Sequence, residues 1–132
     1  MSQENVELVR KVYEHWGRGD FANADFFDPE IEFARFGSGD LDGKWRGLDG
    51  MWGAVAEYLM AWEDMRMNAE RFIDVDDDRV LVLDLQTARG KSSSVVVEHE
   101  LGWLFTLRDG KIVGLTGYWD RAEAMRAAGL EP

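Results

Sequence analysis

The clearest structural signal in the chain is VVVEHELGWLFTL, residues 95–107. Its side chains alternate in character: one parity is apolar apart from one histidine, and the other is mostly polar or small, with Val96 and Leu104 as the exceptions. Since successive side chains of a strand point to opposite faces, this alternation predicts a strand with one core face. The core parity comprises Val95, Val97, His99, Leu101, Trp103, Phe105 and Leu107.

The same period of two extends to both sides of this stretch and predicts an antiparallel meander. Tight links at Asp76-Asp77-Asp78 and Asp109-Gly110 favour hairpins between neighbouring strands. The predicted strands are Met65–Val75, Arg79–Arg89, Ser93–Arg108 and Lys111–Trp119.

The segments before the meander have mostly helical periodicity, with one short strand among them. The predicted helices are Ser2–Trp16, Asp20–Phe27, Leu48–Trp62 and, at the end of the chain, Arg121–Ala128. A strand over Ile31–Arg35 follows the break at Asp28-Pro29, and the glycine-rich residues Gly37–Gly47 are expected to form a loop. Helices followed by a meander indicate an α+β fold, and residues 1–132 are predicted to form a single domain.

Composition restricts the function. The formal net charge of -11 disfavours nucleic acid and membrane surfaces as partners. With no cysteine and two histidines, a metal site is disfavoured, and no cofactor is expected. The N-terminal residues show no signal-peptide pattern, so a cytoplasmic location is expected.

Several short motifs in this order carry a family resemblance. They are Gly19-Asp20 after the first helix, Asp28-Pro29-Glu30-Ile31, the hairpin Leu107–Val113, Tyr118–Ala124 and Ala128-Gly129-Leu130. With them the chain resembles the SnoaL-like proteins of the nuclear transport factor 2-like superfamily, which includes ketosteroid isomerase. The resemblance implies a curved antiparallel sheet wrapped around helices, forming a cone with a ligand pocket, and frequent dimerisation.

Ketosteroid isomerisation does not carry over. Alignment on the shared motifs places the isomerase tyrosine at Val12, beside Tyr13, its carboxylate base at Arg35, and its oxyanion-binding acid at Trp103. The chain also lacks the Arg-x-Asp strand triplet of an epoxide hydrolase of this superfamily. A polyketide-cyclase-like acid/base reaction stays open, as does a non-catalytic ligand-binding or assembly role.

Two residues are candidates for chemistry. His99 is the titratable member of an apolar face and is a candidate acid/base, the alternative being a core histidine with one hydrogen bond. Arg35 shares the parity of Ile31 and Phe33 and is a candidate stabiliser of ligand anionic charge. The alternative is that Arg35 pairs with an Asp or Glu carboxylate of the same chain.

Aromatic residues are the expected pocket walls, since indoles suit both a packed core and a flat ligand. In the related isomerase, the positions of Trp103 and Trp119 face the cavity. The candidate ligand-binding residues are Tyr13, Trp16, Phe33, Trp52, Trp103 and Trp119. The expected ligand is an apolar or aromatic small molecule, anionic if Arg35 contacts it.

A homodimer through the outer sheet face is also predicted, because that face combines apolar and charged side chains. The residues assigned to it are Val80, Val82, Asp84 and Gln86 on one strand, and Val96, Glu98, Glu100, Leu104 and Thr106 on the next.

Overall fold

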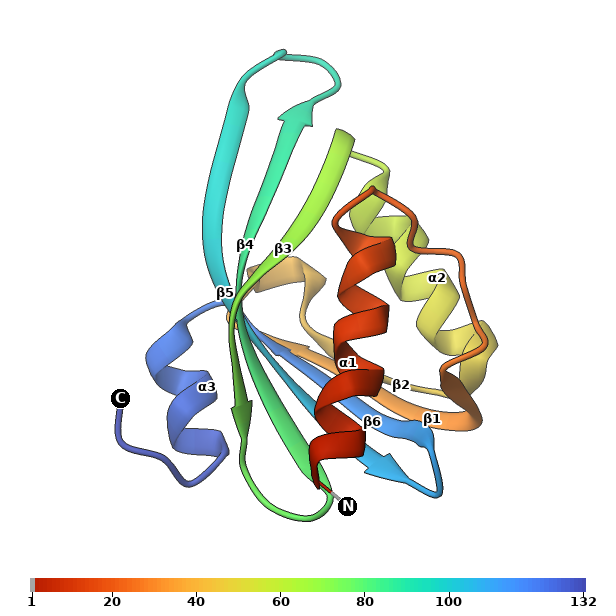
Figure 1. Ribbon diagram of the computed structural model, residues 1–132. Helices are drawn as coiled ribbons and strands as arrows, with labels where there is room; N and C mark the ends of the chain where they lie inside the picture. Colours follow the sequence, from red (N-terminus) through yellow and green to blue (C-terminus); the bar gives the residue numbers. More distant parts are fainter. Residues whose placement is uncertain (1) are drawn as a thin grey trace.

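The computed structural model describes residues 2–132, which form one bent six-stranded sheet and three α-helices (Figure 1). The strand order is β2-β1-β6-β5-β4-β3. All neighbouring strands are antiparallel except β1 and β6. In chain order the elements are α1 (Ser2–Trp16), β1 (Phe27–Phe36), the 3-10 helix η1 (Gly39–Leu41), β2 (Gly43–Arg46), α2 (Gly47–Leu59), β3 (Trp62–Asp74), β4 (Arg79–Gly90), β5 (Val96–Arg108), β6 (Lys111–Tyr118) and α3 (Arg121–Ala127).

The predicted α+β class and the meander of β3 to β6 are confirmed. At the β5–β6 link, Asp109 and Gly110 have φ angles of 52° and 75°. This pair of left-handed residues suits the tight turns that match the twist of two antiparallel strands. The alternation of β5 is confirmed as well, because Leu101, Trp103 and Phe105 are all buried on one face.

Helices α1 and α2 cover the concave face of the sheet (Figure 1). Helix α1 packs on β3 and β4, whereas α2 packs on β1. Val9 and Val12 of α1 are almost completely buried. Burial of a side chain of this size contributes about 1.5–3 kcal/mol. The main core therefore lies between these helices and the sheet.

Helix α3 lies on the opposite, outer face of the sheet. Ala124 and Ala128 of α3 pack with Leu81 of β4 in a second, smaller apolar cluster. Gly102 of β5 permits this close approach, since a Cβ atom at that position would lie 2.4 Å from the Cβ of Ala124. The outer face is thus partly covered by the chain's own C-terminal helix.

The predicted faces of β4 are wrong. Val82 pairs with Trp103, and Gln86 pairs with His99, which places both on the concave face. All the β4 residues assigned to the outer face are in fact buried inside: Val80, Val82, Asp84 and Gln86. Both parities of this strand contain apolar residues because α1 covers one face and α3 covers part of the other.

The helix predicted over Asp20–Phe27 does not form. Asp20 Oδ1 accepts a hydrogen bond from the Ala22 amide at 3.1 Å, and Asn23 Oδ1 accepts one from the Asp25 amide at 2.9 Å. Such local side-chain bonds replace the backbone bonds of a helix.

Several element boundaries also differ from the sequence prediction, among them the start of β5, which is Val96 rather than Ser93. β1 begins at Phe27 rather than Ile31 and includes Pro29, which lies where the pairing with β6 is interrupted and no amide donor is needed. The expected loop contains η1 and the edge strand β2. α2 ends at Leu59, and Trp62 begins β3.

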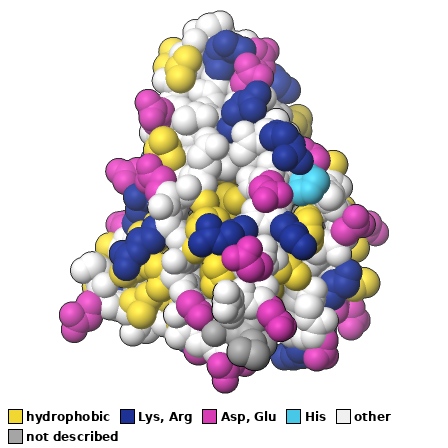
Figure 2. Space-filling view, viewed as in Figure 1, with side chains coloured by type: hydrophobic (Ala, Val, Ile, Leu, Met, Phe, Trp, Pro, Cys, Tyr) yellow, Lys and Arg dark blue, Asp and Glu magenta, His cyan; other side chains and the backbone are white. Residues whose placement is uncertain are grey.

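Acidic and basic side chains are mixed over the face that carries α1 (Figure 2). The excess of acidic residues therefore forms no single patch on that face. Across residues 2–132, none of the helices combines the length and apolar character that a membrane crossing requires.

Candidate ligand-binding cavity

A cavity opens between α1, α2 and the concave face of the sheet. The volume open to the centres of water-sized molecules is about 70 Å³, and the space between the walls, including the open mouth, is about 740 Å³. A cavity of about 150 Å³ holds benzene. The enclosed space here is about 70 Å³, so a single aromatic ring would fill it and extend into the open mouth. Its aromatic wall residues are Trp16, Phe21, Phe27, Phe33, Phe36, Trp52, Tyr58, Trp103, Tyr118 and Trp119.

Arg35 is the one charged residue on this wall among the residues that the structure describes. It follows Phe33 on the inner face of β1, and only 6% of its surface is exposed. Its Nε donates to the Leu41 carbonyl at 2.9 Å, and its Nη1 donates to the Ala54 carbonyl at 3.1 Å. Its Nη2 is buried without a partner.

Among residues 2–132, no carboxylate forms an ion pair with Arg35, although the charges of Glu57 and Asp42 act on it from a greater distance. Aromatic rings surround it instead, with Cζ 4.8 Å from the Trp45 ring centre and 5.2 Å from that of Tyr58. Burial lowers the pKa of the guanidinium, although an arginine in a protein stays charged. The cavity therefore contains a fixed positive charge whose Nη2 group has no acceptor.

Trp103 forms another wall from β5 and stacks on Phe33 with ring centres 5.9 Å apart. Its indole Nε1 is buried and has no hydrogen-bond partner. A third polar group on the wall is satisfied internally, since Gln86 Nε2 lies 2.8 Å from the Tyr58 hydroxyl oxygen. The free donors of the buried wall are thus on Arg35 and Trp103.

Tyr13 and Asp84 form a buried pair that does not line the cavity. The Tyr13 hydroxyl donates to Asp84 Oδ2 at 2.7 Å, and Oδ1 has no partner. Burial raises the pKa of Asp84 to about 7, although the Tyr13 hydrogen bond and the charge of Arg121 act in the opposite direction. The pKa of Tyr13 is raised as well, chiefly by its burial.

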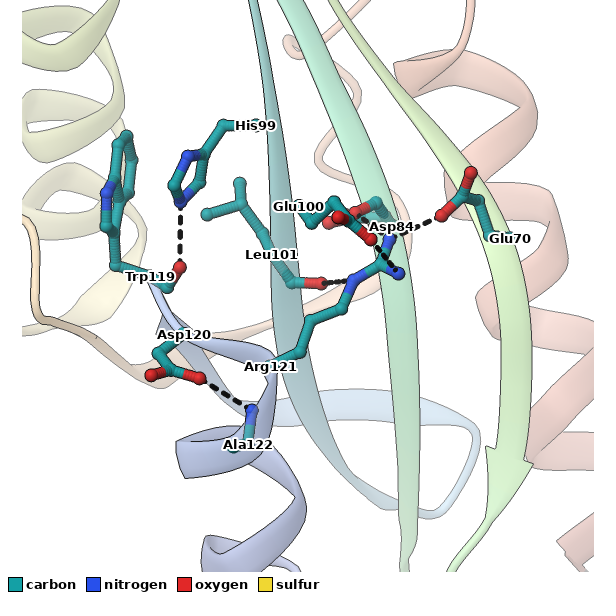
Figure 3. Close-up of polar contacts among 9 residues, drawn as sticks. All are labelled: Glu70, Asp84, His99, Glu100, Leu101, Trp119, Asp120, Arg121 and Ala122. Atoms are coloured by element: carbon teal, nitrogen blue, oxygen red, sulfur yellow. Dashed lines mark hydrogen bonds and ion pairs between the residues drawn. The ribbon is translucent and has the colours of Figure 1, made fainter. Parts of the chain in front are cut away.

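His99 lies against Trp119 and not on the cavity wall (Figure 3). Its Nε2 donates to the Trp119 carbonyl oxygen at 2.8 Å. The two rings stack with centres 4.0 Å apart and planes inclined by 23°. The histidine therefore supports Trp119, a residue of the cavity wall. Its single hydrogen bond agrees with the structural alternative, whereas its candidate acid/base role stays a prediction.

Arg121, at the start of α3, ties this helix to β3, β4 and β5 (Figure 3). Its Nη1 lies 2.7 Å from Glu100 Oε2, and its Nη2 lies 2.5 Å from Glu70 Oε1. Its Nη2 also donates to the Asp84 carbonyl at 2.6 Å. Asp120 caps the helix by accepting from the Ala122 amide at 2.7 Å. These contacts fix the segment that begins with Trp119.

Most of the sequence-predicted site residues meet at the cavity. Tyr13 and His99 lie outside its wall, in the positions described above. The predicted residues that line it are Trp16, Phe33, Arg35, Trp52, Trp103 and Trp119. Their contact with a ligand stays a prediction.

Sequence reasoning missed the internal polar residues of β4, Asp84 and Gln86. They share the parity of Val80 and Val82, and a register between β4 and β5 would have placed that parity opposite Trp103. The orientation of Asp84 and Gln86 could therefore be predicted from the register between β4 and β5, but not from the sequence of β4 alone.

The cavity wall, within residues 2–132, contains no carboxylate and no imidazole. A reaction that abstracts a proton needs a base within hydrogen-bond reach of the substrate, or through one water. In the same part of the chain, no three His, Cys, Asp or Glu side chains come together as a metal site would require.

A family model for the SnoaL-like domain matches residues 9–115. Among curated proteins, none matches this sequence. Several solved structures share the fold. A nuclear transport factor 2-like protein of unknown function from Burkholderia pseudomallei is 20% identical with a TM-score of 0.77, the match covering 93% of this chain and 95% of that one.

Two further structures bear on ligands of this fold. TerC, co-crystallised with polyporic acid, is 20% identical with a TM-score of 0.76, over 96% of this chain and 98% of its own. A candidate SnoaL-like polyketide cyclase from Jannaschia is 18% identical with a TM-score of 0.76, over 98% of this chain and 94% of its own. At these identities the likeness shows the fold alone.

Proposed function

The chain belongs to the SnoaL-like domain family, and we propose that it binds a small, flat, largely apolar molecule in its cavity. In this proposal Arg35 holds an anionic or electron-rich oxygen of the molecule, and the aromatic walls pack against its ring.

Arg35 is the observation that carries the proposal. A buried N–H without an acceptor costs about 1–3 kcal/mol, and more where the group is charged. Arg35 Nη2 is such a group, on the wall of a cavity with room for a small molecule. A ligand oxygen at Nη2 would supply both an acceptor and the missing negative charge.

The aromatic walls favour a planar ligand. Trp103 and Phe33 already stack on each other, and Trp16 lies edge-on to Trp103 with ring centres 6.1 Å apart. Aromatic rings gain about 0.5–1.5 kcal/mol per well-oriented pair beyond their buried area. TerC, which has a similar fold, was co-crystallised with polyporic acid, so a protein of this fold has been crystallised with an organic acid.

Binding without turnover fits the cavity better than acid/base catalysis. Arg35 and Trp103 could stabilise an enolate oxygen, as a polyketide-cyclase-like reaction would require. The base for such a reaction is missing from the described wall, and His99 would reach a ligand only after Trp119 moved aside. Ketosteroid isomerisation is disfavoured further, because Arg35 and Trp103 replace its two acidic groups.

Calorimetry with benzoate and the neutral benzamide tests the proposal. We expect the wild-type protein to bind benzoate more tightly, and Arg35→Met to weaken benzoate at least about tenfold while changing benzamide little. Arg35→Lys keeps the charge without the fork that bonds Leu41 and Ala54, so its result separates charge from geometry. Equal weakening of both ligands in Arg35→Met would show a packing role and contradict the proposal.

A further inference from the structure

One row of residues crosses the three central strands at the cavity. Arg35 of β1 pairs with Gly117 of β6, and Gly117 pairs with Trp103 of β5 (Figure 1). All three point to the concave face. Because neighbouring strands lie about 4.8 Å apart, Arg35 and Trp103 are separated at the backbone by roughly twice that spacing. The middle residue of the row, Gly117, contributes no side chain.

Gly117 also determines where Trp103 lies. A Cβ atom at Gly117 would be 2.6 Å from the Cη2 and Cζ3 atoms of the Trp103 ring. The indole therefore leans over β6, toward the strand that carries Arg35. On the other side of Arg35, Gly43 accommodates the Trp45 ring in the same manner, with Cη2 2.8 Å from the position of a Cβ atom.

Arg35 and Trp103 are both more than nine-tenths buried, and each has one nitrogen without a hydrogen-bond partner, Nη2 of Arg35 and Nε1 of Trp103. Nε and Nη1 of Arg35 each already donate to a carbonyl, that of Leu41 and that of Ala54 respectively. Nη2 is therefore the guanidinium nitrogen that is left without an acceptor. Trp103 Nε1 is the second free donor of the row.

We propose that Arg35 Nη2 and Trp103 Nε1 together form one carboxylate subsite above Gly117, and that the ligand is a carboxylic acid on a single aromatic ring. The inference rests on the proposed binding function and adds the class of ligand. A carboxylate has two acceptor oxygens and no donor, so each oxygen takes one of the two N–H groups. The positive charge of Arg35 selects the ionised form, and the cavity volume limits the ring system.

Nuclear magnetic resonance of the indole N–H groups tests this directly. The chain has six tryptophans, and Trp103→Phe identifies the Trp103 signal by its disappearance. We expect benzoate, but not toluene, to move that signal downfield in the wild-type protein. If benzoate binds and the Trp103 signal does not move, the subsite is wrong.

Affinity measurements with matched variants give the second test. Trp103→Phe keeps a ring but removes the donor, and should weaken benzoate about tenfold. Trp62→Phe is the matched control at a half-buried tryptophan outside the cavity wall and should change benzoate binding less than about threefold. Gly117→Ala should also weaken benzoate, because it displaces Trp103, whereas Gly53→Ala, with open space at its Cβ position, should not.

The outcomes separate the two proposals. Tighter binding of benzoate than of benzamide with an unmoved Trp103 signal would overturn the shared carboxylate subsite and leave the proposed function intact. Toluene binding with no preference for benzoate, or no binding of toluene, benzamide and benzoate alike, would overturn both. If Trp103→Phe does not fold, as judged by circular dichroism, the wild-type N–H shift and the Gly117→Ala affinity still decide the question.

Discussion

Asp84 should make the stability of this protein depend on pH. Its side chain is fully buried beside Tyr13, and burial raises its pKa to about 7. In the unfolded chain an aspartate has a pKa of about 3.9. Below about pH 4 the carboxyl is protonated in both states, so it contributes no pH dependence there.

Between about pH 4 and pH 7 the folded protein keeps a proton that the unfolded chain releases. The free energy of unfolding should therefore fall as pH rises through this interval, by up to about 1.4 kcal/mol per pH unit, and level off above it. From the pKa of about 7, the loss attributable to Asp84 reaches roughly 4 kcal/mol at pH 8.

Asp84→Asn removes the ionisation and should remove this dependence. The amide can still accept from Tyr13, but its NH₂ group has no obvious partner, which costs about 1–3 kcal/mol at every pH. We expect the stability of the variant relative to wild type to increase by roughly 2.6 kcal/mol between pH 5 and pH 8, with the variant the more stable of the two at pH 8.

Urea unfolding followed by tryptophan fluorescence from pH 5 to pH 8 measures the difference. Glu98→Gln is the control, because it makes the same change of charge at an exposed position. Parallel stability curves for wild type and Asp84→Asn would refute the reasoning, since they would mean that Asp84 is ionised in the folded protein throughout.

Three other predictions concern the walls and the outer face. His99→Phe preserves a ring against Trp119 but loses the 2.8 Å bond to its carbonyl, and calorimetry should show weaker benzoate binding. Gly102→Ala should lower the unfolding free energy by about 1–3 kcal/mol in urea, because its Cβ would collide with Ala124 of α3. The homodimer stays a prediction, now through the part of the outer face that α3 leaves open, where Val96 is 68% exposed. Light scattering should give about 30 kDa for a chain of 15.1 kDa, and Val96→Glu should lower that mass, whereas about 15 kDa for wild type would contradict the dimer.

The sequence predicted the elements that a single local pattern specifies. The inner parity of β5 is apolar apart from His99, and the outer parity is mostly polar or small. Asp109-Gly110 is a turn that its own two residues specify. Arg35 was placed on the inner face by its parity with Phe33, and the structure has it there.

Features that depend on partners were not predictable in this way. β4 is covered by α1 on its inner face and partly by α3 on its outer face. Both parities therefore contain apolar residues, and alternation along the strand does not indicate which parity faces the core. His99 shares the parity of Leu101 and Trp103 on β5. Whether its side chain lines the cavity depends on the position of Trp119, which directly follows β6. The free N–H groups of Arg35 and Trp103 could be recognised only after every other donor had been assigned a partner.

A crystal structure of the protein with benzoate tests the central claim, that Arg35 holds an anionic oxygen of a ligand within the aromatic cavity. We predict the benzoate ring between the aromatic walls and one carboxylate oxygen roughly 2.7–3.2 Å from Arg35 Nη2. A benzoate bound outside the cavity, or bound inside with its carboxylate turned to the mouth and Nη2 still without an acceptor, would contradict the account.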